Sequence, residues 1–233
     1  MSERHELQAV AERYARREAA ADRYSVLRPE VWQTLHERQR ALLRLWHQLA
    51  LPPLADLHLT EVGCGSGGNL LEMLRLGLTP GRLTGIELLP ERHAQAREVL
   101  PPATRLLLGD ATQADIAAGS QDIVLQATVF SSLLDDGFQQ QLAAAMWRWL
   151  KPGGAVLWYD FTVDNPFNRD VRGVPWSRVQ ALFPAASRVV SRRVTLAPPL
   201  ARVLCRLHPS LYSLANAVPW LRTHRLAWIE KPR

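Results

Sequence analysis

The sequence predicts an α/β domain in which helices cover both faces of a doubly wound, mostly parallel, seven-stranded sheet. Three observations predict this class. Short apolar segments alternate with helical ones, a glycine-rich turn joins the first apolar segment to a helix, and acidic residues stand at the ends of the first three segments. A length of 233 residues is ordinary for one domain of this kind.

The expected strands are short runs rich in Leu, Val and Ile, as in parallel sheets buried on both faces. They lie at residues 57–61, 82–88, 104–108, 122–127, 154–161, 188–196 and 222–229. Residues 138–150 are predicted to form a helix. The KPGG sequence at 151–154 should end that helix and form a hairpin before the fifth strand, because proline cannot continue a helix and glycine lets the chain reverse.

The turn after the first strand, EVGCGSGG at 61–68, predicts a ligand site. Gly63, Gly65 and Gly67 lack a Cβ, so the backbone can turn sharply and a ligand can lie against it, while the next helix offers free N–H groups. Gly63, Gly65 and Gly68 also satisfy the G-x-G-x-x-G pattern of dinucleotide sites. The glycines alone leave the ligand open.

Glu61 favours a ligand without a phosphate. A carboxylate two residues before the first glycine would repel a pyrophosphate, whereas it would attract the ammonium and sulfonium groups of S-adenosylmethionine (SAM). Residues 61–67 resemble the first motif of the class I SAM-dependent methyltransferases, which commonly reads E/D-x-G-x-G-x-G. The resemblance implies the Rossmann-like fold of that family and SAM as the cofactor.

The resemblance also implies roles for individual residues. It places Glu87, at the end of the second strand, on the two ribose hydroxyls, and a carboxylate can accept both bonds. NAD-binding folds have an acidic residue at the same place, so Glu87 does not discriminate between SAM and NAD as the cofactor. Asp110 is implied to meet the adenine amino group, with Ala111 beside the ring. The candidate cofactor-binding residues are Glu61, Gly63, Cys64, Gly65, Asn69, Glu87, Leu88, Asp110, Ala111, Gln126, Tyr14, Arg17 and Tyr24.

Composition narrows the class of protein. The net charge of +6 comes almost entirely from arginines that are scattered along the chain, which favours a solvated surface over a nucleic-acid face. The fourth strand lacks the D/N-P-P-Y/F sequence of amino-group DNA and RNA methyltransferases. Cys64 and Cys205 are too few for a disulfide framework or a zinc site, so no metal is expected.

The ends of the chain and its apolar runs predict a cytoplasmic protein. No apolar run reaches the roughly twenty residues that span a bilayer, and the first residues lack the apolar region of a secretory signal. Contact with the surface of the inner membrane stays open as an alternative.

Residues 1–50 are predicted to form a helical cap of two helices, interrupted near 24–29. Pro29 fits the first turn of the second helix. An N-terminal cap commonly closes the SAM pocket in the resembled family, so a lid is expected here. Residues 51–233 then form the SAM-binding domain, with a helical insertion at 197–220. The insertion is either an extra helix on the core, or a wall for a hydrophobic acceptor, or a membrane-surface element.

Methyl transfer requires an acceptor held in line with the SAM methyl group, and a base only if the acceptor carries a proton of high pKa. The acceptor is expected beyond the fourth and fifth strands. Asp160 is the first candidate for a base, because burial at a strand end raises a carboxyl pKa; a turn cap is the alternative. Tyr159 and His224 are the other candidate bases. The candidate acceptor-binding residues are Thr128, Ser131, Asn165, Arg169 and Arg172.

Residues 159–173 resemble those of a bacterial methyltransferase subgroup that acts on small molecules or cell-envelope glycans. The leading hypothesis is methyl transfer to O or N of a small-molecule, glycan or lipid-linked acceptor. An RNA or protein methyltransferase is the second hypothesis. A NAD-dependent oxidoreductase and a non-catalytic SAM-binding module come third. The sequence leaves the acceptor and the oligomeric state unassigned.

Overall fold

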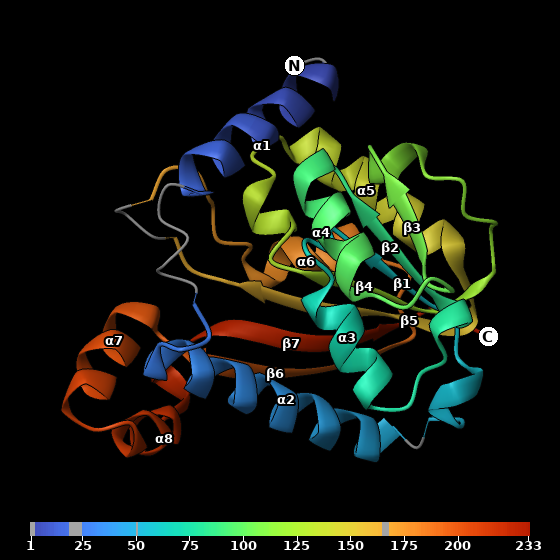
Figure 1. The fold of residues 1–233 in the computed structure, drawn as a ribbon. Helices are drawn as coiled ribbons and strands as arrows, with labels where there is room; N and C mark the ends of the chain where they lie inside the picture. Colours follow the sequence, from blue (N-terminus) through green and yellow to red (C-terminus); the bar gives the residue numbers. More distant parts are fainter. Residues whose placement is uncertain (1–2, 19–24, 50, 165–167) are drawn as a thin grey trace.

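The computed structural model describes residues 3–18, 25–49, 51–164 and 168–233. Seven strands form one sheet in the order β3-β2-β1-β4-β5-β7-β6 (Figure 1). The strands from β1 to β5 pair in parallel, and β7 is antiparallel to both β5 and β6. The predicted fold class is confirmed. The strands are β1 (Leu59–Val62), β2 (Leu83–Glu87), β3 (Arg105–Leu108), β4 (Gln121–Ala127), β5 (Leu150–Phe161), β6 (Arg188–Leu196) and β7 (Arg222–Glu230).

Helices cover both faces of the sheet, because alternate residues of each buried strand supply two apolar cores. Val156 and Trp158 of β5 face one core, which packs against α1, α5 and α6, and Leu157 and Tyr159 face the other, which packs against α2, α3 and α4. The helices are α1 (Glu3–Glu18), α2 (Pro29–Leu49), α3 (Gly68–Arg75), α4 (Pro90–Val99), α5 (Asp136–Trp149), α6 (Trp176–Leu182), α7 (Pro198–Leu207) and α8 (Ser210–Asn216).

The KPGG sequence differs from its prediction in one respect. Helix α5 ends at Trp149, as the stop signal predicts, but β5 already begins at Leu150. The sequence therefore forms an irregularity within β5, not a hairpin before it. Gln121 of β4 pairs with Leu150 while Ile123 pairs with Ala155, so residues 151–154 of β5 lie opposite Asp122 alone. On the other side of β5, the Lys231 N–H just after β7 bonds to the Gly154 carbonyl.

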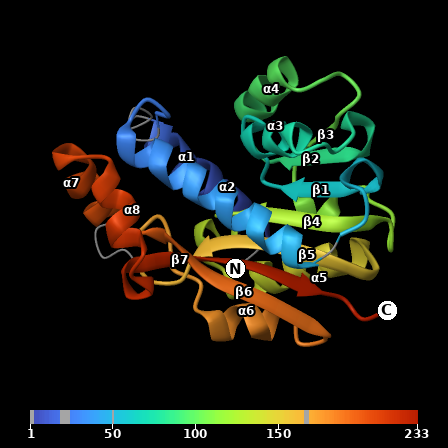
Figure 2. The ribbon, with the colours of Figure 1, turned by 90° about the horizontal axis from the view of Figure 1, so that it is seen from below.

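The two N-terminal helices lie on different faces of the sheet. Helix α2 begins at Pro29, as predicted, and packs against β6, β7 and α7, whereas α1 packs on the face that carries α5 (Figures 1 and 2). The two helices therefore do not form one layer.

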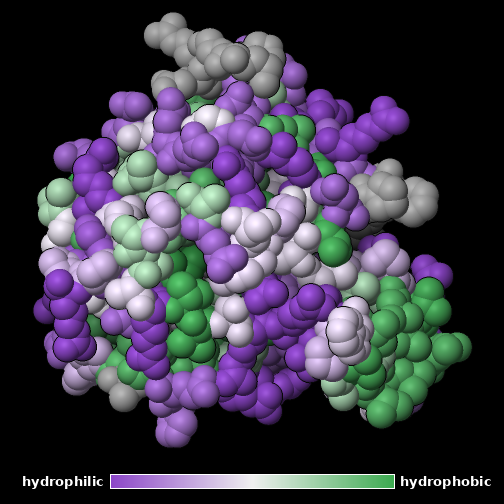
Figure 3. Space-filling model, turned by 180° about the vertical axis from the view of Figure 1, so that it is seen from behind, coloured by the Kyte–Doolittle hydropathy of each residue, from purple (hydrophilic) through white to green (hydrophobic). Residues whose placement is uncertain are grey.

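Between β6 and β7 the chain forms α7, α8 and a short 3₁₀ turn, Pro219–Leu221. Ala201, Cys205 and Tyr212 pack with Leu196 into a small separate core. Many apolar side chains of this insertion stay on the outside and form the large green area of Figure 3. Within the described ranges, none of the helices is long and apolar enough to cross a membrane.

Candidate active site

The glycine turn after β1 depends on the missing side chains. Gly63, Gly65 and Gly67 have φ angles of +65°, +55° and +86°, which residues with a Cβ rarely adopt. A Cβ on Gly63 would lie 2.7 Å from the Cγ2 atom of Val129. A Cβ on Gly65 would meet only the Nη1 atom of Arg92, at 4.0 Å. The backbone at Gly65 therefore borders open space, as a site for a ligand requires.

Glu87 at the end of β2 connects the glycine turn after β1 to the turn after β2 through hydrogen bonds. Its Oε2 atom accepts the N–H of Gly65 at 2.7 Å, and its Oε1 atom accepts the N–H of Leu89 at 2.9 Å. Each carboxylate oxygen can accept a second hydrogen bond. The fixed and largely buried carboxylate thus fits a pair of neighbouring hydroxyls such as those of a ribose.

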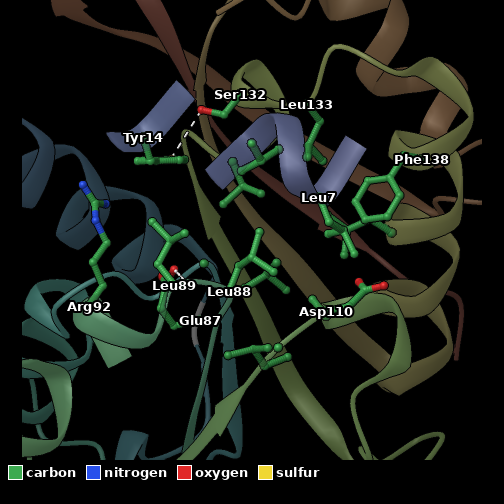
Figure 4. A pocket seen from close by; sticks show the side chains of 18 residues that line it. Leu7, Tyr14, Glu87, Leu88, Leu89, Arg92, Asp110, Ser132, Leu133 and Phe138 are labelled. Atoms are coloured by element: carbon green, nitrogen blue, oxygen red, sulfur yellow. Dashed lines mark hydrogen bonds between the residues drawn. The ribbon is translucent and has the colours of Figure 1, made fainter. Parts of the chain in front are cut away.

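A pocket opens beside Glu87 at the carboxyl ends of β1 to β4 (Figure 4). Asp110 borders it, and its two oxygens accept the backbone N–H and the hydroxyl of Thr112, both at 2.8 Å, which fixes the turn after β3. Six predicted cofactor-binding residues line the pocket: Tyr14, Gly63, Glu87, Leu88, Asp110 and Ala111. Sequence reasoning missed Leu89, Arg92 and Val129, whose side chains carry no motif.

Helix α1 closes one side of the pocket with Leu7, Val10 and Tyr14. The ring of Tyr14 lies 4.5 Å from the Arg92 guanidinium.

A buried ion pair holds α1 in place. Arg13 donates to the Glu6 carboxylate at 2.6 Å and to the Ser132 carbonyl at 3.0 Å, and the same Glu6 oxygen accepts the N–H of Leu134 at 2.8 Å. The sequence did not predict this pair, because the backbone groups that hold it, at Ser132 and Leu134, lie more than a hundred residues away.

Glu61 is fully buried at the end of β1. Its Oε1 atom accepts the side-chain N–H of Asn69 at 2.6 Å, and the Asn69 oxygen accepts a bond from Arg38 at 2.6 Å. Among the described residues, the Oε2 atom of Glu61 has no hydrogen-bond partner. Burial raises the pKa of Glu61 to about 8, against the opposing effects of Asn69 and Arg38. An orphaned buried carboxylate oxygen fits a cationic ligand group such as an ammonium.

Asp160 is also fully buried, and both of its carboxylate oxygens accept hydrogen bonds from backbone N–H groups. One accepts the N–H of Ser131 at 3.1 Å, and the other accepts the N–H of Phe161 at 2.9 Å. Burial raises the pKa of Asp160 to about 7, although the bonds from Ser131 and Phe161 oppose the shift. Asp160 is not among the residues that line the pocket, and its role as a base stays a prediction.

Tyr159 and His224 lie on the opposite face of the sheet from Asp160, with their rings stacked 5.1 Å apart. The Tyr159 hydroxyl is 2.9 Å from that of Thr195. Burial raises the pKa of Tyr159 to about 12 and, together with Arg38, lowers the pKa of His224 to about 4. Their catalytic roles also stay predictions.

Three candidate acceptor residues hold the loops after β4 and β5 together. Thr128 ends β4 with a φ of +59°, and its carbonyl accepts the Ser131 hydroxyl at 3.3 Å. Arg172 donates its N–H to the Ser131 carbonyl at 2.9 Å and pairs with Asp136 of α5. Arg169 is exposed.

The remaining candidates divide into placed and unplaced residues. Gln126 is fully buried, donates its side-chain N–H to the Tyr159 carbonyl of β5, and accepts the N–H of Val129 in the loop after β4. Cys64 is buried in the glycine turn, and burial raises the pKa of its thiol. Tyr24, Asn165 and the side chain of Arg17 lie outside the described residues.

Solved structures with the same fold are methyltransferases. The N1-methyltransferase of 1,6-didemethyltoxoflavin from Burkholderia thailandensis, solved with S-adenosylhomocysteine, has a TM-score of 0.66 and 18% identity, with 100% of this chain and 92% of that chain covered. Phosphoethanolamine N-methyltransferase 1 from Haemonchus contortus has a TM-score of 0.66 and 13% identity, with 100% of this chain and 50% of that chain covered. A SAM-dependent methyltransferase from Archaeoglobus fulgidus has a TM-score of 0.58 and 12% identity, covering 82% and 94%.

These likenesses, together with the site at the carboxyl edge of the sheet, define the fold of the class I SAM-dependent methyltransferases. Residues 60–154, which contain the glycine turn, Glu87 and Asp110, match the methyltransferase domain family. The chain therefore carries a SAM-dependent methyltransferase domain. A comparison of the sequence with curated proteins gives no match.

Proposed function

We propose that SAM binds across the carboxyl edge of the sheet with its ribose on Glu87. The observation that carries this proposal is the Glu87 carboxylate, which two backbone N–H groups fix between the glycine turn and the pocket while each oxygen can accept one more bond. The adenine would lie in the pocket among Leu88, Asp110 and Ala111, where apolar walls and a single carboxylate suit an aromatic ring with one amino group.

The methionine end of SAM would lie toward Glu61 and Arg38. The unpartnered Glu61 oxygen suits its ammonium group, and Arg38, two hydrogen bonds away through Asn69, suits its carboxylate. A bound ammonium group would favour the ionised form of Glu61, so the zwitterion would meet one negative and one positive side chain. Phosphate groups would meet Glu61 and Glu87 together, which disfavours a dinucleotide.

Helix α1 supports a role as the lid of this site. It forms one wall of the pocket, and its attachment through Glu6 and Arg13 is confined to the loop after β4. Helix α2 lies on the other face, so we assign the lid to α1 alone and place α2 with the main domain, which modifies the boundary at residue 50.

Bound SAM supplies a methyl group activated by its sulfonium charge. The residues of this chain would exclude water from that group and hold an acceptor oxygen or nitrogen in line with it. The favoured acceptor is a small molecule, a glycan or a lipid-linked compound, and the favoured location is the cytoplasm. Two of the structural relatives are named as methyltransferases of small molecules, 1,6-didemethyltoxoflavin and phosphoethanolamine.

Two measurements test the proposal. Calorimetry should detect binding of SAM and S-adenosylhomocysteine and none of NADH; NADH binding without SAM binding would overturn it. A screen of small-molecule, glycan, lipid, RNA and protein acceptors that monitors S-adenosylhomocysteine release then identifies the acceptor class.

The hypothesis that Asp160 is the catalytic base is tested with that acceptor, by measuring kcat of Asp160→Asn across pH. A fall of roughly a hundredfold at unchanged SAM affinity supports it, and near-normal kcat refutes it.

A further inference from the structure

The insertion between β6 and β7 exposes far more apolar surface than a helical pair on a core requires. Leu207, Leu214 and Trp220 are 74%, 71% and 83% exposed, and Val203 and Val218 are exposed beside them. These five side chains are here called the α7–α8 patch. Figure 3 shows a large hydrophobic area over α7 and α8. A contiguous patch of this kind on a soluble domain indicates an interaction surface.

The start of α2 adjoins this patch and extends it. The Thr34 hydroxyl of α2 lies 3.3 Å from the hydroxyl of Tyr212, the buried centre of the insertion. Leu27, just before α2 begins, is 90% exposed, and Trp32 in the first turn of α2 is more than half exposed. Two segments far apart in sequence thus present apolar side chains on neighbouring elements.

The segment of the chain that contains the patch carries formal charges of one sign. From residue 171 to residue 229 the chain has nine arginines and no aspartate or glutamate, so this segment carries +9 while the rest of the chain, within a total of +6, carries −3. Arg202 and Arg206 each precede an exposed apolar residue on α7, so an arginine strip runs beside the apolar strip. The Arg193 guanidinium lies 5.8 Å from the Trp220 ring.

Of the acidic side chains that the structure describes, Glu30 in the first turn of α2 and the buried Glu37 face this region. The Glu30 carboxylate lies 3.9 Å from Arg28, and its side chain is largely covered. The exposed surface around the patch is therefore both apolar and positive.

The insertion also leaves the sheet at the edge that carries the site. Leu196 at the end of β6 pairs with Arg222 at the start of β7, and Phe161 at the end of β5 pairs with His224. The α7–α8 patch is thus attached at the carboxyl end of β5, where an acceptor is expected to enter.

We propose that the α7–α8 patch docks on the surface of an anionic phospholipid bilayer. Apolar side chains that enter the headgroup layer and arginines that meet lipid phosphates are the two attractions that hold an interfacial helix, and this insertion presents both on one side. A second copy of the chain fits less well, because a symmetric contact would bring Arg202 and Arg206 of each copy toward those of the other. The inference stands without reference to the methyl acceptor.

Vesicle co-sedimentation tests it with the full chain. The protein should sediment with vesicles of phosphatidylcholine mixed with phosphatidylglycerol, should bind vesicles of pure phosphatidylcholine at least about tenfold more weakly, and should be released by salt. Leu207→Gln with Leu214→Gln, and separately Arg202→Glu with Arg206→Glu, should each weaken binding to the anionic vesicles by about tenfold or more.

Matched control variants make the same kinds of substitution outside the α7–α8 patch. Val99→Gln removes an exposed apolar side chain from α4, and Arg75→Glu with Arg148→Glu reverses two exposed arginines of α3 and α5. Both controls should bind the vesicles as the wild type does. None of the test positions lines the pocket, so thermal melting and SAM binding should be unchanged in every variant, which separates failure of docking from failure of the site.

Three results would overturn the proposal. The first is no binding to anionic vesicles, and the second is equal binding to neutral ones. The third is a wild-type protein that light scattering shows to be a dimer and that Leu207→Gln with Leu214→Gln makes monomeric, since the patch would then be a protein interface.

Discussion

At the scale of single residues, Gly65 distinguishes the role of the glycine turn in binding from its role in folding. Its φ of +55° makes a branched residue strained, at a cost of about 1–2 kcal/mol, but the space beside it is open. Gly65→Val should therefore remain folded, with a small loss of melting temperature, and should lose SAM binding because the side chain occupies the ligand's place. Calorimetry and thermal melting measure the two effects.

Gly77 provides the control for that experiment. It has a φ of +107°, lies past the end of α3, and has nothing within 4 Å of a built Cβ. Gly77→Val should show a loss of stability from the same kind of strain with SAM affinity intact. If Gly65→Val binds SAM as the wild type does, the turn is not the cofactor site.

Glu87→Ala tests the ribose contact. Two charge-assisted hydrogen bonds contribute roughly 1.5–3 kcal/mol each, and water replaces part of the loss, so SAM affinity should fall by about 2–4 kcal/mol. The variant also frees the N–H groups of Gly65 and Leu89, so its melting temperature should fall slightly. Glu91→Ala, an exposed acid on α4, should leave SAM affinity unchanged. A loss below about threefold in Glu87→Ala would place the ribose elsewhere.

At the scale of elements, the proposed lid function of α1 depends on the buried pair of Glu6 and Arg13. Breaking a buried pair by removing one partner costs about 3–5 kcal/mol, and most of α1's polar attachment depends on this pair. Arg13→Ala should therefore open α1 while the sheet stays folded. Hydrogen exchange should show lost protection in α1 alone, and SAM should dissociate faster.

Arg16→Ala is the matched control on the same helix. Arg16 pairs with Asp170 at 2.6 Å, but its side chain is more than half exposed, and solvent screening makes such exposed pairs contribute little to stability. Protection of α1 and the SAM dissociation rate should change little in this variant. Global unfolding of Arg13→Ala, or unchanged SAM dissociation from it, would contradict the lid.

At the scale of the whole molecule, stability should depend on pH through Glu61. Its pKa rises from 4.5 in the unfolded chain to about 8 in the folded one, so the folded state holds a proton that the unfolded state releases. The resulting stability is fully present below pH 4.5 and is lost as pH rises to about 8. Its size is a few kcal/mol, at about 1.4 kcal/mol per pKa unit. Asp160 acts in the same direction up to about pH 7.

Denaturant titrations of the SAM-free protein measure this loss of stability. They should run from about pH 5 to about pH 9, a range that spans the raised pKa values of Glu61 and Asp160. Glu61→Gln cannot titrate, so its stability should fall less steeply with pH and should exceed that of the wild type at the alkaline end. Glu91→Gln, which removes an exposed carboxylate, should follow the wild-type curve. Parallel curves for Glu61→Gln and the wild type would show that Glu61 does not hold the proton.

The sequence alone determined the strands, the glycine turn and the acids at the strand ends. These features are local: apolar runs specify strands, and Gly63 and Gly65 adopt backbone angles that other residues avoid. Once the strands from β1 to β4 are parallel, their carboxyl ends meet at one edge, so Glu87 and Asp110 necessarily lie beside the turn. The fold class and the cofactor class were therefore predictable.

Only the tertiary structure decided which face each helix covers and what each buried polar group contacts. Arg13 meets Ser132 across 119 positions of the chain, and Arg38 meets Asn69 from a helix on the other face of the sheet from α1. The sequence left Asp160 open as a base or a turn cap, and the structure shows that it accepts the N–H of Ser131, which lies 29 residues earlier. No periodicity records such contacts, because they depend on how the helices pack and on the need of buried polar groups for partners.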